Sequence, residues 1–249
     1  MSTVPGAAGY AQDADRLIER YEAVAFAAKH RAVLHLLPAL PCDALDIGAG
    51  SGADAAWLAS HGHRVVAVEP TDALRRAGMA LHASAPIEWI DDGLPLLTAT
   101  RQLQRCFDLV MISAVWMHLD AQERRLAMPH VAGLLARHGL LTLSLRHGPG
   151  PSHRRLHEVS AQETITLARR QGLRCLVQAD MPSVQAANRA ADVTWTHLAF
   201  AHDTTATQPE RAIDRSMGDA STPIPRPASA NEAGLLSCGQ RYQATPQSS

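Results

Sequence analysis

A glycine-rich turn in the first quarter of the chain constrains the fold more than any other feature. A short apolar run over residues 44–47 leads into Gly48-Ala-Gly50-Ser-Gly52, and a helical pattern over residues 53–60 follows. Glycines lack a Cβ, so they permit a sharp turn between a strand and a helix and let a ligand approach the backbone. The segment predicts an α/β unit with a ligand at this turn. A tight turn without a ligand is the simpler alternative.

Strand-like and helix-like segments alternate along residues 15–203. The predicted strands cover residues 44–47, 64–69, 87–90, 107–113, 140–145, 174–179 and 192–201, and the predicted helices cover residues 17–37, 53–60, 72–83, 120–137 and 160–172. This alternation predicts a parallel sheet covered by helices on both faces, and right-handed crossovers make it doubly wound. No long helix separates the last two strands, so one of them can run antiparallel.

Helix boundaries have their own signals in the second half of the chain. Asp120 and Glu123 are spaced as in a capping box, and Ser160 with its following Glu163 repeats the pattern. The first of these helices is expected to kink at Pro129 and to run to residue 137. A stop at Gly139 is expected just beyond it.

The two ends of the chain differ from its middle. Residues 204–249 contain no Val, Phe or Trp and carry five prolines. Such a stretch buries too little apolar surface to offset its ordering entropy, so it is predicted to be a disordered C-terminal tail. Residues 1–14 are predicted to be a flexible N-terminus. A single domain is therefore expected over residues 15–203.

Charge and composition exclude several classes of protein. The chain has 23 Lys and Arg against 24 Asp and Glu, which argues against a protein that binds nucleic acid by neutralising phosphates. The longest uncharged apolar run, residues 109–117, is too short to span a membrane, and the N-terminus has no signal-peptide pattern. The four cysteines match no zinc or disulfide framework. A cytoplasmic protein that uses neither membrane nor nucleic acid is expected.

Two acids sit where predicted strands end. Asp46 comes just before the glycine turn, and Glu69 ends the next strand, where an acid can bind a ribose diol. Read as Gly48-x-Gly50-x-x-Ala53, the turn is a dinucleotide fingerprint, typical of an NAD(P)-dependent oxidoreductase. Read as Asp46-x-Gly48-x-Gly50-x-Gly52, it is similar to motif I of the class I S-adenosylmethionine-dependent methyltransferases.

Three further stretches resemble that methyltransferase family. Residues 87–95 (IEWIDDGLP) resemble its third motif, and residues 107–119 (FDLVMISAVWMHL) resemble its fourth motif. Residues 134–143 resemble its turn into the fifth strand, although Arg137 and His138 stand where the family usually has Pro-Gly. In the family's order, the resemblance spans residues 15–201. The oxidoreductase has no comparable support.

The resemblance implies a seven-stranded, mainly parallel sheet with an antiparallel last strand and S-adenosylmethionine at the carboxyl ends of its strands. The glycine turn would face the amino acid and the ribose, Glu69 the ribose, Asp91 or Asp92 the adenine, and Ser113 and Ala114 the methionyl side. The expected cofactor-binding residues are Asp46, Gly48, Ala49, Gly50, Gly52, Glu69, Pro70, Asp91, Asp92, Ser113 and Ala114. A non-catalytic protein that binds S-adenosylmethionine is a further alternative.

Candidates for chemistry lie on loops after the predicted strands. His118 follows the fourth strand, and Arg146 and His147 follow the fifth. A histidine can act as a base near neutral pH, and an arginine can orient an anionic acceptor. No metal site is expected from the His153–His157 spacing. The family's DNA-adenine enzymes carry a Pro-Pro motif after strand four that residues 113–116 lack, so a small-molecule acceptor is expected.

Overall fold

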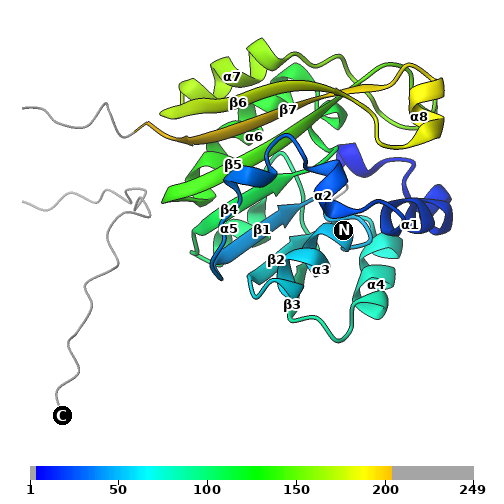
Figure 1. Ribbon diagram of the computed structural model, residues 1–249, viewed down its shortest axis with the longest axis horizontal. Helices are drawn as coiled ribbons and strands as arrows, with labels where there is room; N and C mark the ends of the chain where they lie inside the picture. Colours follow the sequence, from blue (N-terminus) through cyan, green and yellow to red (C-terminus); the bar gives the residue numbers. More distant parts are fainter. Residues whose placement is uncertain (1–3, 204–249) are drawn as a thin grey trace, which may run out of the picture.

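The computed structural model describes residues 4–203. Their strands form one seven-stranded sheet with the order β3-β2-β1-β4-β5-β7-β6 (Figure 1). The strands are β1 (Asp43–Ile47), β2 (Arg64–Val68), β3 (Ile87–Ile90), β4 (Phe107–Ile112), β5 (Leu135–His147), β6 (Leu173–Pro182) and β7 (Thr194–His202). All seven lie within two residues of their predicted ends, apart from an earlier start of β5 and a later end of β6.

The direction of the strands confirms the expected doubly wound sheet with an antiparallel last strand. The pairs β2–β3, β1–β2, β1–β4 and β4–β5 are parallel, whereas β7 is antiparallel to both β5 and β6. The carboxyl ends of the first five strands therefore meet at one edge of the sheet, where open α/β sheets bind ligands.

Helices cover both faces of the sheet. They are α1 (Ala14–Glu22), α2 (Phe26–Lys29), α3 (Ala53–Ser60), α4 (Asp72–Leu81), α5 (Thr98–Gln102), α6 (Ala121–Leu134), α7 (Ala161–Arg169) and α8 (Ala186–Ala190). Alternate residues of β1 divide the core, because Leu45 packs with α6 and α7 while Ala44 packs with α2 and α3. This two-residue period is what places each strand between two apolar layers.

The predicted continuous helix over residues 17–37 is wrong. α1 ends at Glu22, Ala25 is extended, and α2 covers only four residues. The Glu22 carboxylate accepts a hydrogen bond from the Ser51 hydroxyl at 2.6 Å, while Phe26 turns into the core and is 5% exposed. The chain must change direction between these two attachments, and tertiary contacts override the helical spacing.

The predicted end of the long helix at residue 137, with Gly139 as its stop, is also wrong. α6 ends at Leu134 and β5 begins at once, with Leu135 opposite Phe107. The next pair is Leu140 with Leu109, so β5 bulges out between these pairs. A Cβ on Gly139 would lie 2.8 Å from the Phe107 carbonyl oxygen, so glycine there serves the close approach of two strands.

Both predicted helix starts are found. Asp120 and Glu123 form the complete capping box of α6, and Pro129 lies inside that helix. Ser160 caps α7, but the Glu163 side chain pairs with Arg124 at 2.9 Å instead of returning to the cap. Arg124 itself is buried, so the second acid links α7 to α6.

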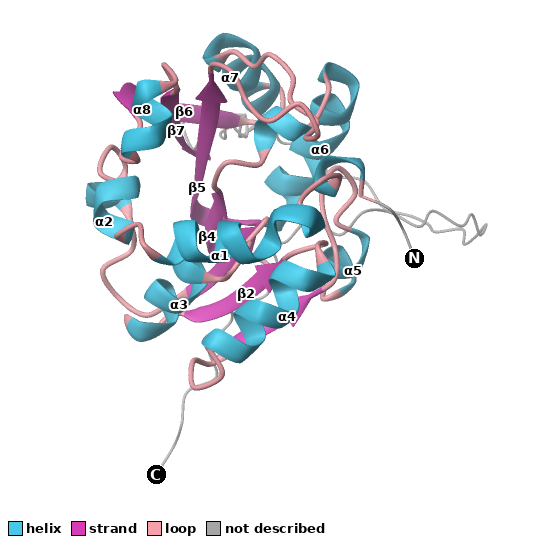
Figure 2. Cartoon of the chain, turned by 90° about the vertical axis from the view of Figure 1, so that its right-hand side faces the viewer, coloured by secondary structure: helices cyan, strands magenta, loops and turns pink. Residues whose placement is uncertain are grey.

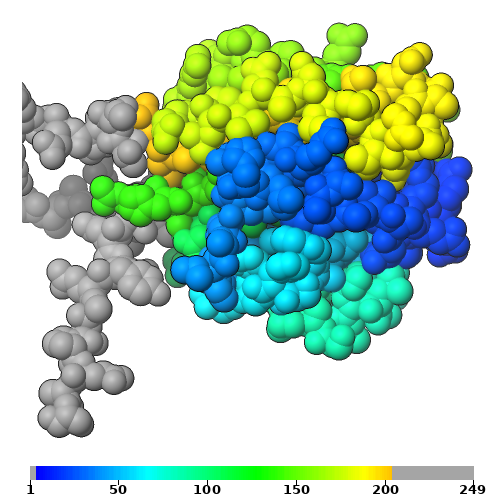
Figure 3. Space-filling model, viewed as in Figure 1, coloured from blue at the N-terminus to red at the C-terminus, as the bar shows by residue number. Residues whose placement is uncertain are grey.

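The N-terminal segment covers the carboxyl edge of the sheet. Residues 4–13 contain two 3-10 helices, Pro5–Ala7 and Ala11–Asp13, and α1 follows directly. Figure 2 shows α1 crossing in front of the strand ends, and Figure 3 shows the N-terminal part of the chain lying between the α3–α4 region and the α8 region. The predicted tail, residues 204–249, lies outside the described residues. Within residues 4–203, none of the helices has the length and apolar character needed to cross a membrane.

Candidate active site

A cavity of about 260 Å³ lies at the carboxyl edge of the sheet, beneath the N-terminal segment. Its floor comes from the glycine turn and from the ends of β1, β2 and β4, and its walls come from α1, the loop after β5 and the segment that joins β6 to α8. Ten of the fourteen residues predicted to bind cofactor or do chemistry line it: Asp46, Gly48, Ala49, Gly50, Glu69, Pro70, Ser113, Ala114, His118 and Arg146. Tyr10 and Tyr21, which were not predicted as site residues, line it as well.

The glycine turn has the backbone geometry that its sequence implies. Gly48, Gly50 and Gly52 have φ values of 76°, 60° and 86°, in the left-handed region that favours glycine. A Cβ on Gly48 would lie 2.3 Å from a Val115 methyl group, and one on Gly50 would lie 3.2 Å from the Tyr21 ring. Gly52 does not line the cavity; its close neighbour is the Trp89 ring. The turn thus forms a narrow backbone cradle between β1 and α3.

Asp46 is a buried carboxylate that lacks part of its hydrogen bonding. It is 1% exposed, and its Oδ2 atom has no hydrogen-bond partner within the described part of the chain. Burial, followed by repulsion from Asp54 and Glu69, raises the pKa of Asp46 far above its ordinary value, and Lys29 only partly offsets this. An unsatisfied buried oxygen that lines a cavity fits a ligand with a positively charged donor.

Asp54, at the start of α3, is a second buried acid near Asp46, and it has charged partners. Its Oδ2 atom accepts hydrogen bonds from Lys29 Nζ at 2.7 Å and from His30 Nε2 at 2.9 Å. Burial alone would raise the pKa of Asp54, but these two partners hold it well below its ordinary value. Lys29 is about one-third exposed, lines the cavity, and has ammonium hydrogens beyond the one given to Asp54.

Glu69 follows β2 and closes the glycine turn. Its two carboxylate oxygens accept hydrogen bonds from Gly50 N at 2.8 Å and from Thr71 N at 2.7 Å. Burial raises the pKa of Glu69, and the two backbone donors oppose that shift. Because each oxygen has only one such donor, each retains a lone pair that can accept from a hydroxyl in the cavity.

The two acids expected near the adenine do not line the cavity. Asp91 is exposed and pairs with Arg75 at 3.1 Å. Asp92 accepts hydrogen bonds from Gly93 N and from the backbone and hydroxyl of Thr100, so it holds the start of α5. Gly93 and Leu94, the residues that follow, line the cavity in their place.

His118 is buried in the cavity wall with both ring nitrogens engaged. Nδ1 lies 2.6 Å from the Arg155 carbonyl oxygen, and Nε2 lies 2.6 Å from Tyr10 Oη. A carbonyl can only accept, so Nδ1 carries the proton and Nε2 accepts from the phenol of Tyr10. Burial, together with nearby Arg154 and Arg146, lowers the pKa of His118 although the bond to Arg155 opposes this. The neutral imidazole is the resting form.

Arg146 and His147 were expected on a loop after the fifth strand, but they are the last two residues of β5 and pair with Trp195 and Thr194 of β7. They face two different environments. Arg146 lines the cavity, and its guanidinium donates to the carbonyl oxygens of Gly148 and Pro149. His147 points away from the cavity and pairs with the Thr196 hydroxyl at 2.9 Å. At the floor, Ser144 Oγ accepts a hydrogen bond from Ala114 N at 2.9 Å, which holds Ala114 at a φ of 60°.

Sequence reasoning missed several cavity residues that lie outside the strand-end motifs. Tyr10 lies in the predicted flexible N-terminus, Arg154 lies between β5 and α7, and Asn188 lies on the short helix α8. None of these residues belongs to a motif, so the sequence offers no local signal for them. Within residues 4–203, no cluster of three or more His, Cys, Asp or Glu side chains could hold a metal ion.

The doubly wound sheet, the glycine cradle and the cavity with its two buried acids define a Rossmann-like protein that binds a nucleoside-containing cofactor. Residues 44–139 match the family model described as "Methyltransferase domain". This match agrees with the predicted family: residues 44–139 carry a methyltransferase domain. No curated protein matches the chain in sequence.

Solved methyltransferase structures share the fold. The 1,6-didemethyltoxoflavin-N1-methyltransferase of Burkholderia thailandensis, with S-adenosylhomocysteine bound, is 20% identical with a TM-score of 0.56, over 82% of this chain and 92% of that one. The N-methyltransferase NodS of Bradyrhizobium japonicum WM9, with the same ligand, is 19% identical with a TM-score of 0.55, over 74% and 96%. The magnesium protoporphyrin IX methyltransferase of Synechocystis PCC 6803, with S-adenosylmethionine, is 15% identical with a TM-score of 0.55, over 82% and 86%.

Proposed function

We propose that this enzyme binds S-adenosylmethionine in the cavity and transfers its methyl group to a small-molecule acceptor held beside His118 and Arg146. The unpartnered carboxylate of Asp46 carries the proposal. A buried carboxylate with a free lone pair, above a glycine cradle, suits the ammonium of an amino-acid group. The relatives named above that carry S-adenosylmethionine or S-adenosylhomocysteine support the choice of ligand.

Opposite charges in the cavity fit the two ends of that amino-acid group. Asp46 would accept from the ammonium, and Lys29, with its spare donors, would bind the carboxylate. Glu69 would accept from the ribose hydroxyls, with Gly48, Ala49, Gly50 and Pro70 around them. Gly93 and Leu94, rather than Asp91 or Asp92, would border the adenine. Ser113 and Ala114 would border the methionyl sulfur.

The chain's own residues have a limited chemical task. When bound, S-adenosylmethionine supplies an activated methyl group, so the protein must align an acceptor and exclude water. The N-terminal segment and α1 cover the cavity and exclude water. Arg146 would orient an anionic part of the acceptor. Of the two candidate histidines, only His118 lines the cavity, so only His118 could take up a proton that leaves the acceptor. His147 has no part in this proposal.

Binding of the cofactor is tested by isothermal titration with S-adenosylhomocysteine, with NAD and NADP in parallel. A ligand present at 100 times its dissociation constant also stabilises the fold by about 2.7 kcal/mol, which thermal unfolding detects. We expect binding of S-adenosylhomocysteine alone. Binding of only a nicotinamide ligand would make the chain an oxidoreductase that uses the same turn. Binding without turnover of any acceptor would indicate a non-catalytic S-adenosylmethionine-binding protein.

A further inference from the structure

A short contact joins Tyr10 to His118 in the cavity wall, and the proposed binding of the cofactor does not use it. Tyr10 Oη lies 2.6 Å from His118 Nε2, although the two residues are 108 positions apart in the chain. Their rings meet edge to face, with centroids 5.3 Å apart. Both side chains line the cavity. A short bond of this kind between a phenol and a neutral imidazole is a route for a proton.

His118 cannot meet an acceptor directly. It is 6% exposed, its Nδ1 donates to the Arg155 carbonyl, and its Nε2 is occupied by Tyr10. Tyr10 uses its single hydroxyl hydrogen on His118, and the side chains of Arg154 and Tyr21 also interact with its hydroxyl group. An acceptor in the cavity would donate to the phenol oxygen in the place of one of these side chains. The phenol therefore stands between the base and the cavity.

Several contacts hold the phenol at this point. The Arg154 guanidinium lies 4.5 Å from the centre of the Tyr10 ring, and Arg154 is itself paired with Asp13. Gly6 packs so closely on His118 that a Cβ at Gly6 would lie 3.2 Å from the histidine Cβ. Burial raises the pKa of the Tyr10 phenol, and the nearby Arg154 guanidinium only partly offsets this. The phenol therefore keeps its proton at rest and gives it up only as it receives another.

We propose that Tyr10 and His118 form a proton relay, so that the enzyme methylates an oxygen or nitrogen that carries a proton in the free acceptor. This inference rests on the proposed methyltransferase function. The acceptor atom forms a bond to the methyl carbon, and the methyl–sulfur bond breaks. The acceptor's proton passes to Tyr10 Oη as the phenol proton passes to His118 Nε2. The imidazolium that results is held by the Arg155 carbonyl.

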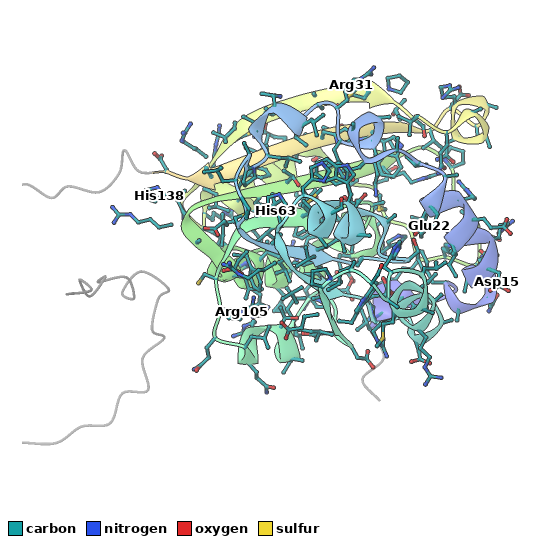
Figure 4. The ribbon with its side chains drawn as sticks, turned by 60° about the horizontal axis from the view of Figure 1, so that its bottom comes forward. Asp15, Glu22, Arg31, His63, Arg105 and His138 are labelled. Atoms are coloured by element: carbon teal, nitrogen blue, oxygen red, sulfur yellow. The ribbon has the colours of Figure 1, made fainter. Side chains whose placement is uncertain are left out.

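The relay is tested with matched acceptors and conservative variants. The probes with a removable proton are catechol, 4-hydroxybenzoate, imidazole and uracil, and the probes without one at neutral pH are pyridine and dimethyl sulfide. Release of S-adenosylhomocysteine is measured by mass spectrometry for wild type, Tyr10→Phe, His118→Gln and the control His138→Gln. His138 is exposed and lies at the opposite end of the molecule from Glu22 of α1 (Figure 4).

We expect turnover of at least one proton-bearing probe and of neither proton-free probe. Tyr10→Phe should lower kcat by about 10²-fold, a typical effect of losing a proton-transfer group, and His138→Gln should leave it unchanged. Affinity for S-adenosylhomocysteine, measured by titration calorimetry, should stay within about threefold in Tyr10→Phe, because that variant removes one hydroxyl outside the cofactor contacts. The same calorimetry shows whether His118→Gln is folded.

A second measurement does not depend on turnover. The ¹⁵N NMR spectrum of His118 should show a protonated Nδ1 and a hydrogen-bonded, unprotonated Nε2 in wild type. In Tyr10→Phe the tautomer should stay the same, while the hydrogen-bond shift at Nε2 disappears. A protonated Nε2 in wild type would overturn the relay.

Other outcomes separate the relay from the methyltransferase function. Undiminished turnover by Tyr10→Phe, turnover of pyridine or dimethyl sulfide, or binding of S-adenosylhomocysteine without turnover of any proton-bearing probe would each overturn the relay while the cofactor site stands. Failure of wild type to bind S-adenosylhomocysteine would overturn the proposed function itself.

Discussion

At the scale of single residues, the most informative position is the carboxylate of Asp46. A buried carboxyl group with an unpartnered oxygen opposes folding, so its presence indicates a ligand that completes its hydrogen bonding. We expect Asp46→Asn to lower the affinity for S-adenosylhomocysteine ten- to a hundredfold, about 1.4–2.7 kcal/mol. The free energy of unfolding should be unchanged or raised, because the amide cannot ionise in this buried position. Titration calorimetry and urea unfolding measure the two effects, and lost stability with unchanged affinity would contradict the assignment.

The pH dependence of binding follows from the raised pKa of Asp46. Its carboxyl group binds a proton in the free protein at pH values where an ordinary Asp is ionised, but an ammonium requires the ionised form. Affinity for S-adenosylhomocysteine should therefore rise as pH increases through this raised pKa, with a proton released on binding. Calorimetry in buffers of different ionisation enthalpy detects that proton. Asp46→Asn should show neither effect, and Glu88→Gln, on the outer face of β3, should behave as wild type.

Two glycines allow a matched comparison of backbone constraint. Gly48 has a φ of 76° and a Val115 methyl group 2.3 Å from the place of its Cβ, whereas Gly133 in α6 has no neighbour within 4 Å of that place. Gly48→Ala should destabilise the fold by roughly 1–2 kcal/mol and abolish binding of S-adenosylhomocysteine. Gly133→Ala should stabilise it by roughly 0.5–1 kcal/mol. Urea unfolding measures both changes in the free energy of unfolding. If the two variants changed it equally, the backbone at Gly48 would tolerate a side chain, and glycine would not be required there.

At the scale of elements, α1 acts as the cover of the cavity, and polar side chains at its C-terminal end attach it. Arg20 donates to the Gln185 side chain at 2.7 Å, and Glu22 accepts from the Ser51 hydroxyl and pairs with His82 at 3.3 Å. Figure 4 shows Glu22 at the inner end of α1 and Asp15 near its outer end. These attachments join the cover to α8, to the glycine turn and to the end of α4.

Removal of these attachments should loosen the cover without unfolding the protein. In Arg20→Ala combined with Glu22→Ala, we expect S-adenosylhomocysteine to dissociate several-fold faster, while unfolding changes by at most about 1 kcal/mol, since exposed ion pairs contribute little. Stopped-flow displacement measures the dissociation rate. Asp15→Ala combined with Arg16→Ala, on the outer part of the same helix, serves as the control. An equal dissociation rate in both double variants would mean that α1 does not limit release.

Elements with a local signal were predictable from sequence, and elements defined by distant partners were not. The strands β1 to β4 and the turn at Gly48 follow from apolar runs and glycines, and Asp120 marks the start of α6. The break after Glu22 depends on Ser51, and the start of β5 at Leu135 depends on Phe107. The same distinction applies to the cavity. Its floor comes from the glycine turn and strand ends, which have local signals, whereas its cover comes from residues 4–22 and its far wall from the segments after β5 and β6, which have none.

At the scale of the whole molecule, burial of neutral histidines makes stability depend on pH. His197, on β7 in the wall of the cavity, is 7% exposed, and burial with the nearby His30 and Lys29 lowers its pKa to about 4. A folded-state pKa below the unfolded value of about 6.5 means that the unfolded chain binds the proton first. This contribution to stability is complete above pH 6.5 and is lost as pH falls from there to about 4.

The size of that loss can be measured directly. Lowering the pKa of His197 from 6.5 to about 4 corresponds to roughly 3 kcal/mol. The free energy of unfolding should therefore fall by up to that amount between pH 7 and pH 4 through His197 alone. His197→Gln removes the titrating group, and its unfolding free energy should vary less steeply with pH over this interval. The control His138→Gln should keep the wild-type slope, because that side chain is exposed. Urea unfolding at a series of pH values decides the matter: parallel curves for wild type and His197→Gln would show that the acid sensitivity of the fold arises from other groups.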